Sequence, residues 1–115
     1  MNNFSEKHHE FIREVMQTYP EVREGRMFGY PVFFVGRRMF ACIYGDGVGL
    51  KLPAEDVRRL LAMPGVAPFQ PHGRRRMREW VQIDRQRSSE YALDIPVLEK
   101  AIRYASDLCR EEEEK

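Results

Sequence analysis

The chain has 115 residues, of which 43% are hydrophobic and 11% aromatic, and its formal net charge is +1. This composition argues against disorder, and the near-neutral charge gives no general attraction to nucleic acid or to a membrane surface. No apolar run approaches the roughly 20 residues of a membrane span, and the N-terminus lacks the pattern of a signal peptide. We therefore expect one soluble, cytoplasmic domain with a core at about 4–109 and an acidic tail at 110–115.

The N-terminal segment has the spacing of an amphipathic helix. Apolar residues recur every three or four positions from Phe4 to Tyr19, and either Asn3 or Ser5 is suitably placed as the N-cap. Pro20 is expected to end this helix, because its ring cannot continue the hydrogen-bond ladder.

The next part of the chain has the composition of β-structure. Aromatic and β-branched residues dominate, and glycines supply the positive φ that tight turns require. The pattern predicts three antiparallel strands, the first beginning at about Arg26 or Tyr30, over 26–35, 39–44 and 48–52. Because Pro31 cannot donate a ladder hydrogen bond, we expect its strand to be an edge strand or to carry a bulge there.

The second half of the chain continues with a helix, a loop and a further strand. Pro53 is expected to open the helix at its first turn, and the segment 66–73, rich in proline and glycine, is predicted as a loop without regular structure. Alternation over 77–84 predicts a strand with Trp80 and Gln82 on one face and Val81 and Ile83 on the other.

A last helix and an acidic end complete the predicted elements. Asp94 is suitably placed to cap this helix, and the charge run at 111–115 is expected to fray. The order is thus helix, three strands, helix, one or two strands, helix. This order predicts an α+β fold, a two-layer sandwich in which helices pack on an antiparallel sheet of about five strands.

Several short motifs follow one another between Tyr19 and Leu108. They are Met27–Tyr30, Met39–Ala41, Leu50–Leu52, Pro64–Gly65, Pro68–Phe69, Gly73–Arg74, Met77 and Trp80–Val81. In order and spacing they resemble the N-terminal domain of the TfoX/Sxy family, and the strand pattern has a weaker likeness to YjbR-type domains. The resemblance implies the same α+β fold. It also implies a regulatory role, since longer members with a second, C-terminal helical domain regulate natural DNA competence. We expect a standalone N-terminal domain, and the family brings no catalytic residues or cofactors.

A cluster of arginines is the first candidate binding site. Arg74, Arg75, Arg76 and Arg78 lie close to Trp80, so guanidinium groups and a stacking ring are available within a few positions. A solvated loop is the favoured interpretation. Binding to phosphate or nucleic acid and binding to an acidic protein partner are the alternatives.

A second candidate is an apolar cleft lined by Met27, Phe28, Tyr30 and Phe69. Methionine and aromatic side chains beside a glycine can form apolar walls, although residues of this kind more often belong to the core.

The sequence offers no pattern for metal or nucleophilic chemistry. His8 and His9 point about 100° apart on a helix, so they do not form a metal pair, and His8 is expected to be partly buried. Cys42 lies among apolar strand residues and is predicted to be a small apolar filler. For Cys42 and Cys109 we favour reduced thiols, although their spacing leaves one disulfide open.

We therefore expect a non-enzymatic binding or regulatory module, with no catalytic residues, metal or cofactor, that acts through contacts with an unknown protein partner. A nucleic-acid-binding protein that uses Arg74–Arg78 is the first alternative. A small-molecule-binding protein or enzyme with a pocket near Met27–Tyr30 is the second. No membrane contact is expected, and the chain could self-associate as a homodimer through a sheet edge.

Overall fold

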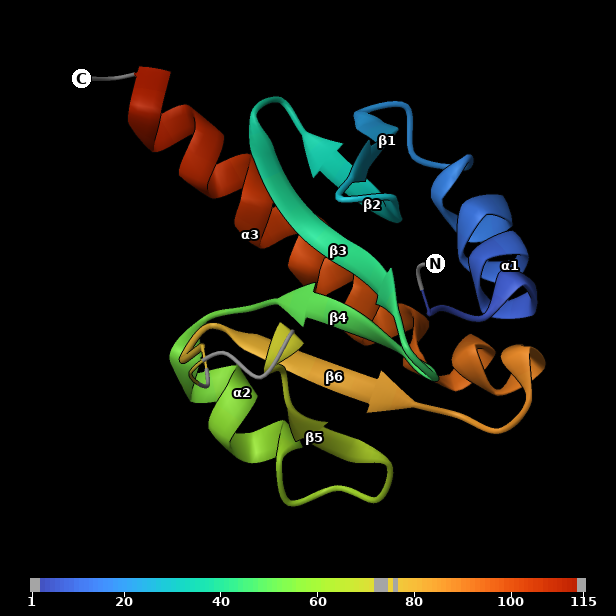
Figure 1. The fold of residues 1–115 in the computed structure, drawn as a ribbon. Helices are drawn as coiled ribbons and strands as arrows, with labels where there is room; N and C mark the ends of the chain where they lie inside the picture. The colour runs from blue at the N-terminus through green and yellow to red at the C-terminus, as the bar shows by residue number, and fades with distance from the viewer. Residues whose placement is uncertain (1–2, 72–74, 76, 114–115) are drawn as a thin grey trace.

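A six-stranded antiparallel sheet organises the fold in the spatial order β1-β2-β3-β4-β6-β5 (Figure 1). The computed structural model describes residues 3–71, 75 and 77–113. The strands are β1 Val22–Met27, β2 Tyr30–Val35, β3 Arg38–Tyr44, β4 Gly47–Lys51, β5 Val66–Pro68 and β6 Trp80–Asp84. The helices are α1 Glu6–Met16, α2 Ala54–Leu60 and α3 Ile95–Glu113, and a 3-10 helix, η2 Ser88–Asp94, leads into α3.

The helices pack on one face of the sheet, where α3 crosses behind β3 and β4 in Figure 1. Side chains from α1, α2 and α3 form one buried cluster with alternate residues of the central strands. The largest members of this core are Ile12, Met16, Phe33, Phe40, Ile43, Leu50, Leu52, Ile83, Tyr91 and Leu98. Burial of these apolar surfaces is the main stabilising contribution to the fold.

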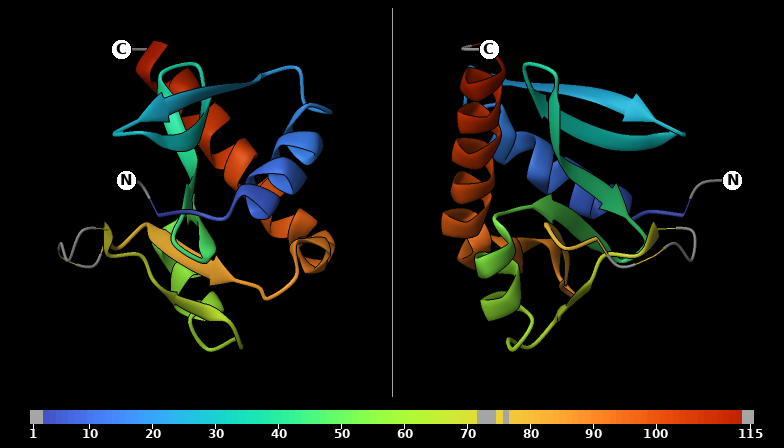
Figure 2. Two further views of the ribbon diagram at one scale, coloured as in Figure 1. Left: turned by 45° about the vertical axis from the view of Figure 1, so that its right-hand side comes forward. Right: turned by 90° about the vertical axis from the view of Figure 1, so that its left-hand side faces the viewer.

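In the part of the chain that the structure describes, the other face of the sheet carries no helix, and it is called the open face here. The sheet curves strongly (Figures 1 and 2). The β1–β2 hairpin therefore flanks the open face on one side, and the β4–β6–β5 strands flank it on the other. A second, smaller buried cluster lies on this face and consists of Tyr30, Val32, Cys42, Phe69 and Trp80. The fold is thus two layers of secondary structure with a second apolar cluster outside them.

The predicted α+β fold is confirmed, including the two faces of β6. Val81 and Ile83 belong to the helix-side core, whereas Trp80 belongs to the open-face cluster. α1 begins after Ser5, whose hydroxyl accepts a hydrogen bond from the backbone N–H of His8, as a capping residue should. The helix ends at Met16, before the proline expected to end it.

The structure has one strand more before α2 than the sequence predicts, because Val22–Met27 forms β1 and pairs with β2. Charged residues occupy much of β1, and most of its side chains are exposed or only partly buried. A strand at the edge of a sheet needs little apolar surface, and charge there discourages pairing with another chain. Because β1 has no apolar stripe, the periodicity of the sequence did not predict this strand.

Pro31 does not mark an edge or a bulge, so that expectation is wrong. β2 lies between β1 and β3, and its irregularity falls between Phe33 and Phe34. Pro31 is the second residue of β2 and pairs with Arg26, beyond the last matched pair of β2 and β3 at Val32. Its missing N–H therefore interrupts no described β2–β3 pair.

Regular structure also extends further than predicted near both helices of the second half. Val66–Pro68, predicted as loop, forms the short edge strand β5 against β6, a position that tolerates a terminal proline. α3 continues to Glu113, so the described part of the predicted frayed tail is helical, and Arg38 forms an ion pair with Glu112. Asp94 ends η2 directly before α3, and its carboxylate accepts two hydrogen bonds from Arg85.

Both histidines of α1 are buried and hydrogen-bonded. His8 donates from Nε2 to the Arg85 carbonyl at 2.9 Å and lies 2.6 Å from the Ser88 hydroxyl. His9, whose burial the helical spacing did not predict, donates to Glu24 at 2.9 Å. The two side chains tie α1 to η2 and to β1. Among the described residues, no helix combines the length and apolar character needed to cross a membrane.

The ion pair between α1 and β1 leads to a prediction on pH. Hydrogen bonding by the Arg13 guanidinium, and by His9, lowers the pKa of Glu24 below its ordinary value of 4.5. A folded-state pKa below the unfolded value means that ionised Glu24 stabilises the fold above about pH 4.5, and that this stabilisation is lost as the pH falls through the lowered pKa. We expect Glu24→Gln to reduce the free energy of unfolding near neutral pH and to have a smaller effect in acid. Urea denaturation at both pH values measures this; an equal effect at both would contradict it.

Candidate functional site

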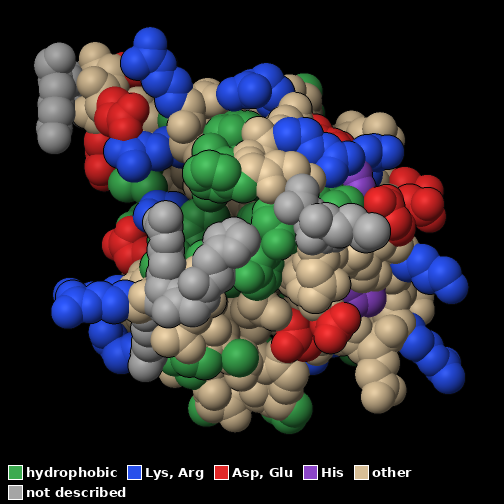
Figure 3. Space-filling view, in the orientation of Figure 1, with side chains coloured by type: hydrophobic (Ala, Val, Ile, Leu, Met, Phe, Trp, Pro, Cys, Tyr) green, Lys and Arg blue, Asp and Glu red, His purple; other side chains and the backbone are tan. Residues whose placement is uncertain are grey.

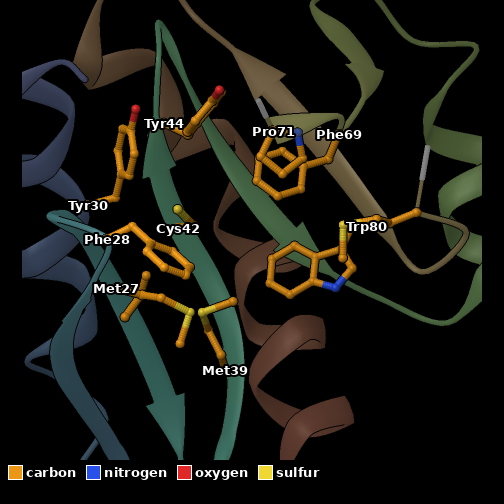
Figure 4. Close-up of a pocket in the computed structure, with 11 residues that line it drawn as sticks. Met27, Phe28, Tyr30, Met39, Cys42, Tyr44, Phe69, Pro71 and Trp80 are labelled. Atoms are coloured by element: carbon orange, nitrogen blue, oxygen red, sulfur yellow. The ribbon is translucent and has the colours of Figure 1, made fainter. Parts of the chain in front are cut away.

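The open face contains an apolar pocket of about 180 Å³ between the β1–β2 hairpin and β6. Figure 3 shows hydrophobic side chains gathered in a hollow on this face, and Figure 4 shows them converging from both sides. The lining residues are Met27, Phe28, Tyr30, Val32, Met39, Cys42, Tyr44, Phe69, Pro71, Met77 and Trp80. An engineered cavity of about 150 Å³ accepts benzene, so this pocket has room for one ring or one branched aliphatic side chain.

Strand alternation and register place four of these side chains together. Tyr30 and Val32 are two positions apart on β2, Cys42 and Tyr44 are two positions apart on β3, and Val32 pairs directly with Cys42. Because side chains alternate between the faces of a strand, all four point to the open face. The ring centroids of Tyr30 and Tyr44 lie 4.9 Å apart.

The opposite wall depends on a glycine in β4. The Phe69 ring lies directly over Gly49, where an added Cβ would come within 2.9 Å of it. Phe69 then stacks on Trp80, with ring centroids 5.4 Å apart, and meets Tyr44 edge-on at 5.7 Å. Phe69 therefore reaches the pocket only because β4 has no side chain at this point.

Phe28 stands at the rim in an unfavourable backbone conformation. It is the first residue of the two-residue turn between β1 and β2, with φ of 52°, and Gly29 follows with φ of 85°. This turn favours Asn or Asp followed by Gly, because most L-residues are strained at positive φ. Its ring is 80% exposed and yet points toward the pocket (Figure 4). A strained backbone that presents an exposed aromatic ring is typical of a functional position.

Cys42 lies at the base of the pocket as an unreactive thiol. Both cysteines are free, and burial raises the pKa of Cys42 to about 12. A thiol with so high a pKa stays protonated near neutral pH, and a protonated thiol is a poor nucleophile. We expect iodoacetamide to modify the partly exposed Cys109 at least about tenfold faster, as mass spectrometry of timed samples would show. Equal rates at the two positions would contradict the burial of Cys42.

Exposed arginines are sequence neighbours of two lining residues, although none of them lines the pocket itself. Arg26 precedes the lining residue Met27, and Arg75 and Arg78 stand on either side of the lining residue Met77. All three arginines are exposed. Lys51 lies 5.9 Å from the centre of the Trp80 ring, but it is paired with Glu79 at 3.2 Å.

The structure separates the two candidate sites of the sequence. Met27, Phe28, Tyr30 and Phe69, proposed as a cleft, all line the pocket, and Trp80 lines it too, although the sequence assigned Trp80 to the arginine cluster. Trp80 is only 5% exposed. Arg75 and Arg78 are exposed, whereas Arg74 and Arg76 lie outside the described residues.

Sequence reasoning missed six lining residues: Val32, Met39, Cys42, Tyr44, Pro71 and Met77. The alternation of β3 carried a signal for two of them, because Cys42 and Tyr44 share a face. The described residues contain no group of three or more His, Cys, Asp or Glu side chains that could hold a metal ion.

The fold is that of a small α+β domain whose antiparallel sheet has helices on one face and an apolar pocket on the other. The chain belongs to the TfoX N-terminal domain family, whose model matches residues 14–104. The matched region contains every residue that lines the pocket. No curated protein and no solved structure gives a significant match.

Proposed function

We propose that this chain is a non-enzymatic binding and regulatory module that acts through protein–protein contacts. The open-face pocket is where a partner places one large apolar side chain. The observation that carries the proposal is Phe28, an exposed ring held at positive φ at the rim of an apolar pocket of about 180 Å³. Exposed apolar surface of this kind marks interaction sites, and aromatic residues beside a pocket often dominate binding energy.

The chemistry of the lining favours binding over catalysis. Its hydrogen-bonding groups are the hydroxyls of Tyr30 and Tyr44, the Trp80 indole and the Cys42 thiol, and the other lining side chains are apolar. Such a surface recognises shape and apolar area, and the three methionines among the lining residues can adapt to different side chains.

The burial of Trp80 and Tyr30 favours a protein partner over nucleic acid. Binding of single strands uses aromatic faces on which bases stack. Trp80 is 5% exposed and Tyr30 is 8% exposed, and both are packed against other rings of the pocket. Neither presents a free face beside the arginines.

Substitution of Phe28 tests whether the strained turn serves binding. We expect Phe28→Asn to raise the free energy of unfolding by about 0.5–1 kcal/mol, because Asn tolerates positive φ much better than Phe. The same substitution should weaken partner binding because it removes the exposed ring. Chemical denaturation measures the first effect; a loss of stability would show that Phe28 serves the fold instead.

The proposal is tested by selecting random displayed peptides on the immobilised chain. The matched control is Cys42→Phe, which places a ring inside the pocket without changing the surface charge. We expect peptides with a large apolar residue that bind the native chain and not this variant. Because Cys42→Phe could perturb folding, Phe28→Asn serves as a second variant at an exposed position. If no peptide distinguishes the native chain from both variants, the pocket is not a docking site.

A further inference from the structure

We infer that Met27 and Met77 are an oxidation-sensitive site, and that conversion of their thioethers to sulfoxides closes the open-face pocket to its partner. This inference rests on the proposed function and adds the regulation of the same pocket. Three features of the described residues carry it: the concentration of sulfur at the pocket, the exposure of two of its methionines, and the apolar walls around them.

Sulfur-containing side chains gather at the pocket. Its lining includes Met27, Met39, Met77 and Cys42. The much larger helix-side core, in the described part of the chain, includes one buried methionine, Met16. Leucine or isoleucine would give walls of similar volume without an atom that peroxides attack. The oxidisable side chains therefore lie where a partner would enter.

The register of the sheet holds two of these methionines on the open face. Met27 ends β1 and pairs directly with Tyr30, so their side chains share a face. On β3 the register with β2 skips Phe40, the extra residue of a β-bulge. The bulge turns Met39 to the same face as Cys42, three positions away. Figure 4 shows the side chains of Met27 and Met39 pointing toward each other.

Exposure decides which methionines an oxidant in solution reaches. Met27 is 40% exposed and Met77 is 38% exposed. Met39 is partly buried, and Met16 is 2% exposed. Met63 is 55% exposed, but it lies beyond the end of α2 and does not line the pocket. Among the described methionines we therefore expect Met27, Met77 and Met63 to react first.

The modification is a two-electron oxygen transfer. Hydrogen peroxide gives one oxygen atom to the thioether sulfur, so that the sulfur is oxidised to a sulfoxide and the peroxide is reduced to water. Cys42 does not compete for the oxidant inside the pocket, because burial raises the pKa of its thiol and the thiolate is the reactive form. The exposed thioethers are thus the reactive sulfur atoms of the pocket.

A sulfoxide changes the property of the pocket that a partner recognises. The thioether is apolar, whereas the S=O group is polar, and placing an apolar side chain against it without a hydrogen-bond partner is unfavourable. The flexible side chain can instead turn the oxygen to solvent, which removes one wall of the pocket. Both arrangements weaken the binding of an apolar anchor.

The experiment measures the affinity of a pocket-dependent peptide, one that binds the native chain and not Cys42→Phe, before and after treatment of the chain with hydrogen peroxide. The peptide contains no Met, Cys or Trp, and the peroxide is removed before it is added. All chains carry Cys109→Ser, which removes the partly exposed thiol and keeps a donor to the Val35 carbonyl. We expect mass spectrometry to find sulfoxide at Met27 and Met77, and the affinity to fall about tenfold, as for one unpaired polar group. Methionine sulfoxide reductases should restore it.

The matched variants replace methionine by leucine, which has a similar volume and no sulfur. Met27→Leu, Met77→Leu should bind the peptide within about threefold of the parent chain and should keep that affinity after peroxide treatment. Met63→Leu removes an exposed methionine away from the pocket, so this variant should lose affinity on oxidation as the parent does. Equal losses in the two variants would overturn the inference.

The outcomes separate the inference from the proposed function. If the peptide binds equally well when Met27 and Met77 are oxidised, only the inference is wrong. If leucine itself abolishes binding, recovery of the oxidised parent chain by the reductases carries the test, and a loss that they do not reverse overturns the inference. If no pocket-dependent peptide appears, the proposed function fails and the regulation fails with it.

Discussion

Phe40→Ala is expected to lower the free energy of unfolding by about 3–5 kcal/mol, the range for truncating a buried aromatic residue. Phe40 lies on β3 in the helix-side core and is 0% exposed. Its removal would leave a cavity that the packed sheet and α3 cannot fully close. A loss this large approaches the whole stability of many small domains. Urea denaturation of the native chain and the variant gives the difference directly.

The matched control for Phe40 is the same substitution at the pocket rim. Phe28 is 80% exposed, so Phe28→Ala should change the free energy of unfolding by less than about 0.5 kcal/mol. Ala has the same difficulty at positive φ as Phe, so the strain of the turn stays. Similar losses for the two variants would mean that the Phe28 ring is part of the core.

Gly49→Val is expected to have the second largest effect, a loss of about 1–3 kcal/mol in the free energy of unfolding, the range for overpacking a filled site. A Cβ at this position would lie 2.9–3.1 Å from three atoms of the Phe69 ring. The ring would have to leave its stack on Trp80, and the wall of the pocket would move with it. We therefore expect both a loss of stability and a loss of peptide binding from a residue that lines no pocket itself.

A double-mutant cycle separates this clash from other effects of the valine. In a Phe69→Ala background the ring is absent, and Gly49→Val should cost less than about 0.5 kcal/mol, since valine otherwise suits a strand. Denaturation of the four chains gives the coupling between the two positions. Additive losses would show that the contact between Gly49 and Phe69 does not limit the substitution.

The sequence predicted those parts of the fold that carry a strong period or a strong turn signal. The alternation around Trp80 and Val81 assigned both faces of β6, because the side-chain period of a strand is two. The sequence pattern did not predict β1 and β5, because edge strands need no continuous apolar stripe. The burial of His9 depends on Glu24, a partner that only the folded sheet brings close.

The site was only partly predictable for the same reason. Met27, Phe28 and Tyr30 are close in sequence and apolar, so the pattern identified them as a candidate wall. Phe69 was assigned to the cleft as well, but the way it forms the opposite wall, across Gly49, depends on long-range packing that no local pattern in the chain encodes. The backbone strain at Phe28 could not be predicted from the sequence either, because it depends on the two-residue turn between β1 and β2.

The measurement that tests the docking pocket most directly is NMR of methionine methyl groups during titration with a selected peptide. Met27, Met39 and Met77 line the pocket, whereas Met16 lies in the helix-side core and Met63 lies near the end of α2. Binding in the pocket predicts saturable shifts of the first three methyl signals, and contacts from the peptide anchor to them, with the signals of Met16 and Met63 unchanged. Binding that leaves the three pocket methyl signals unmoved would contradict the account.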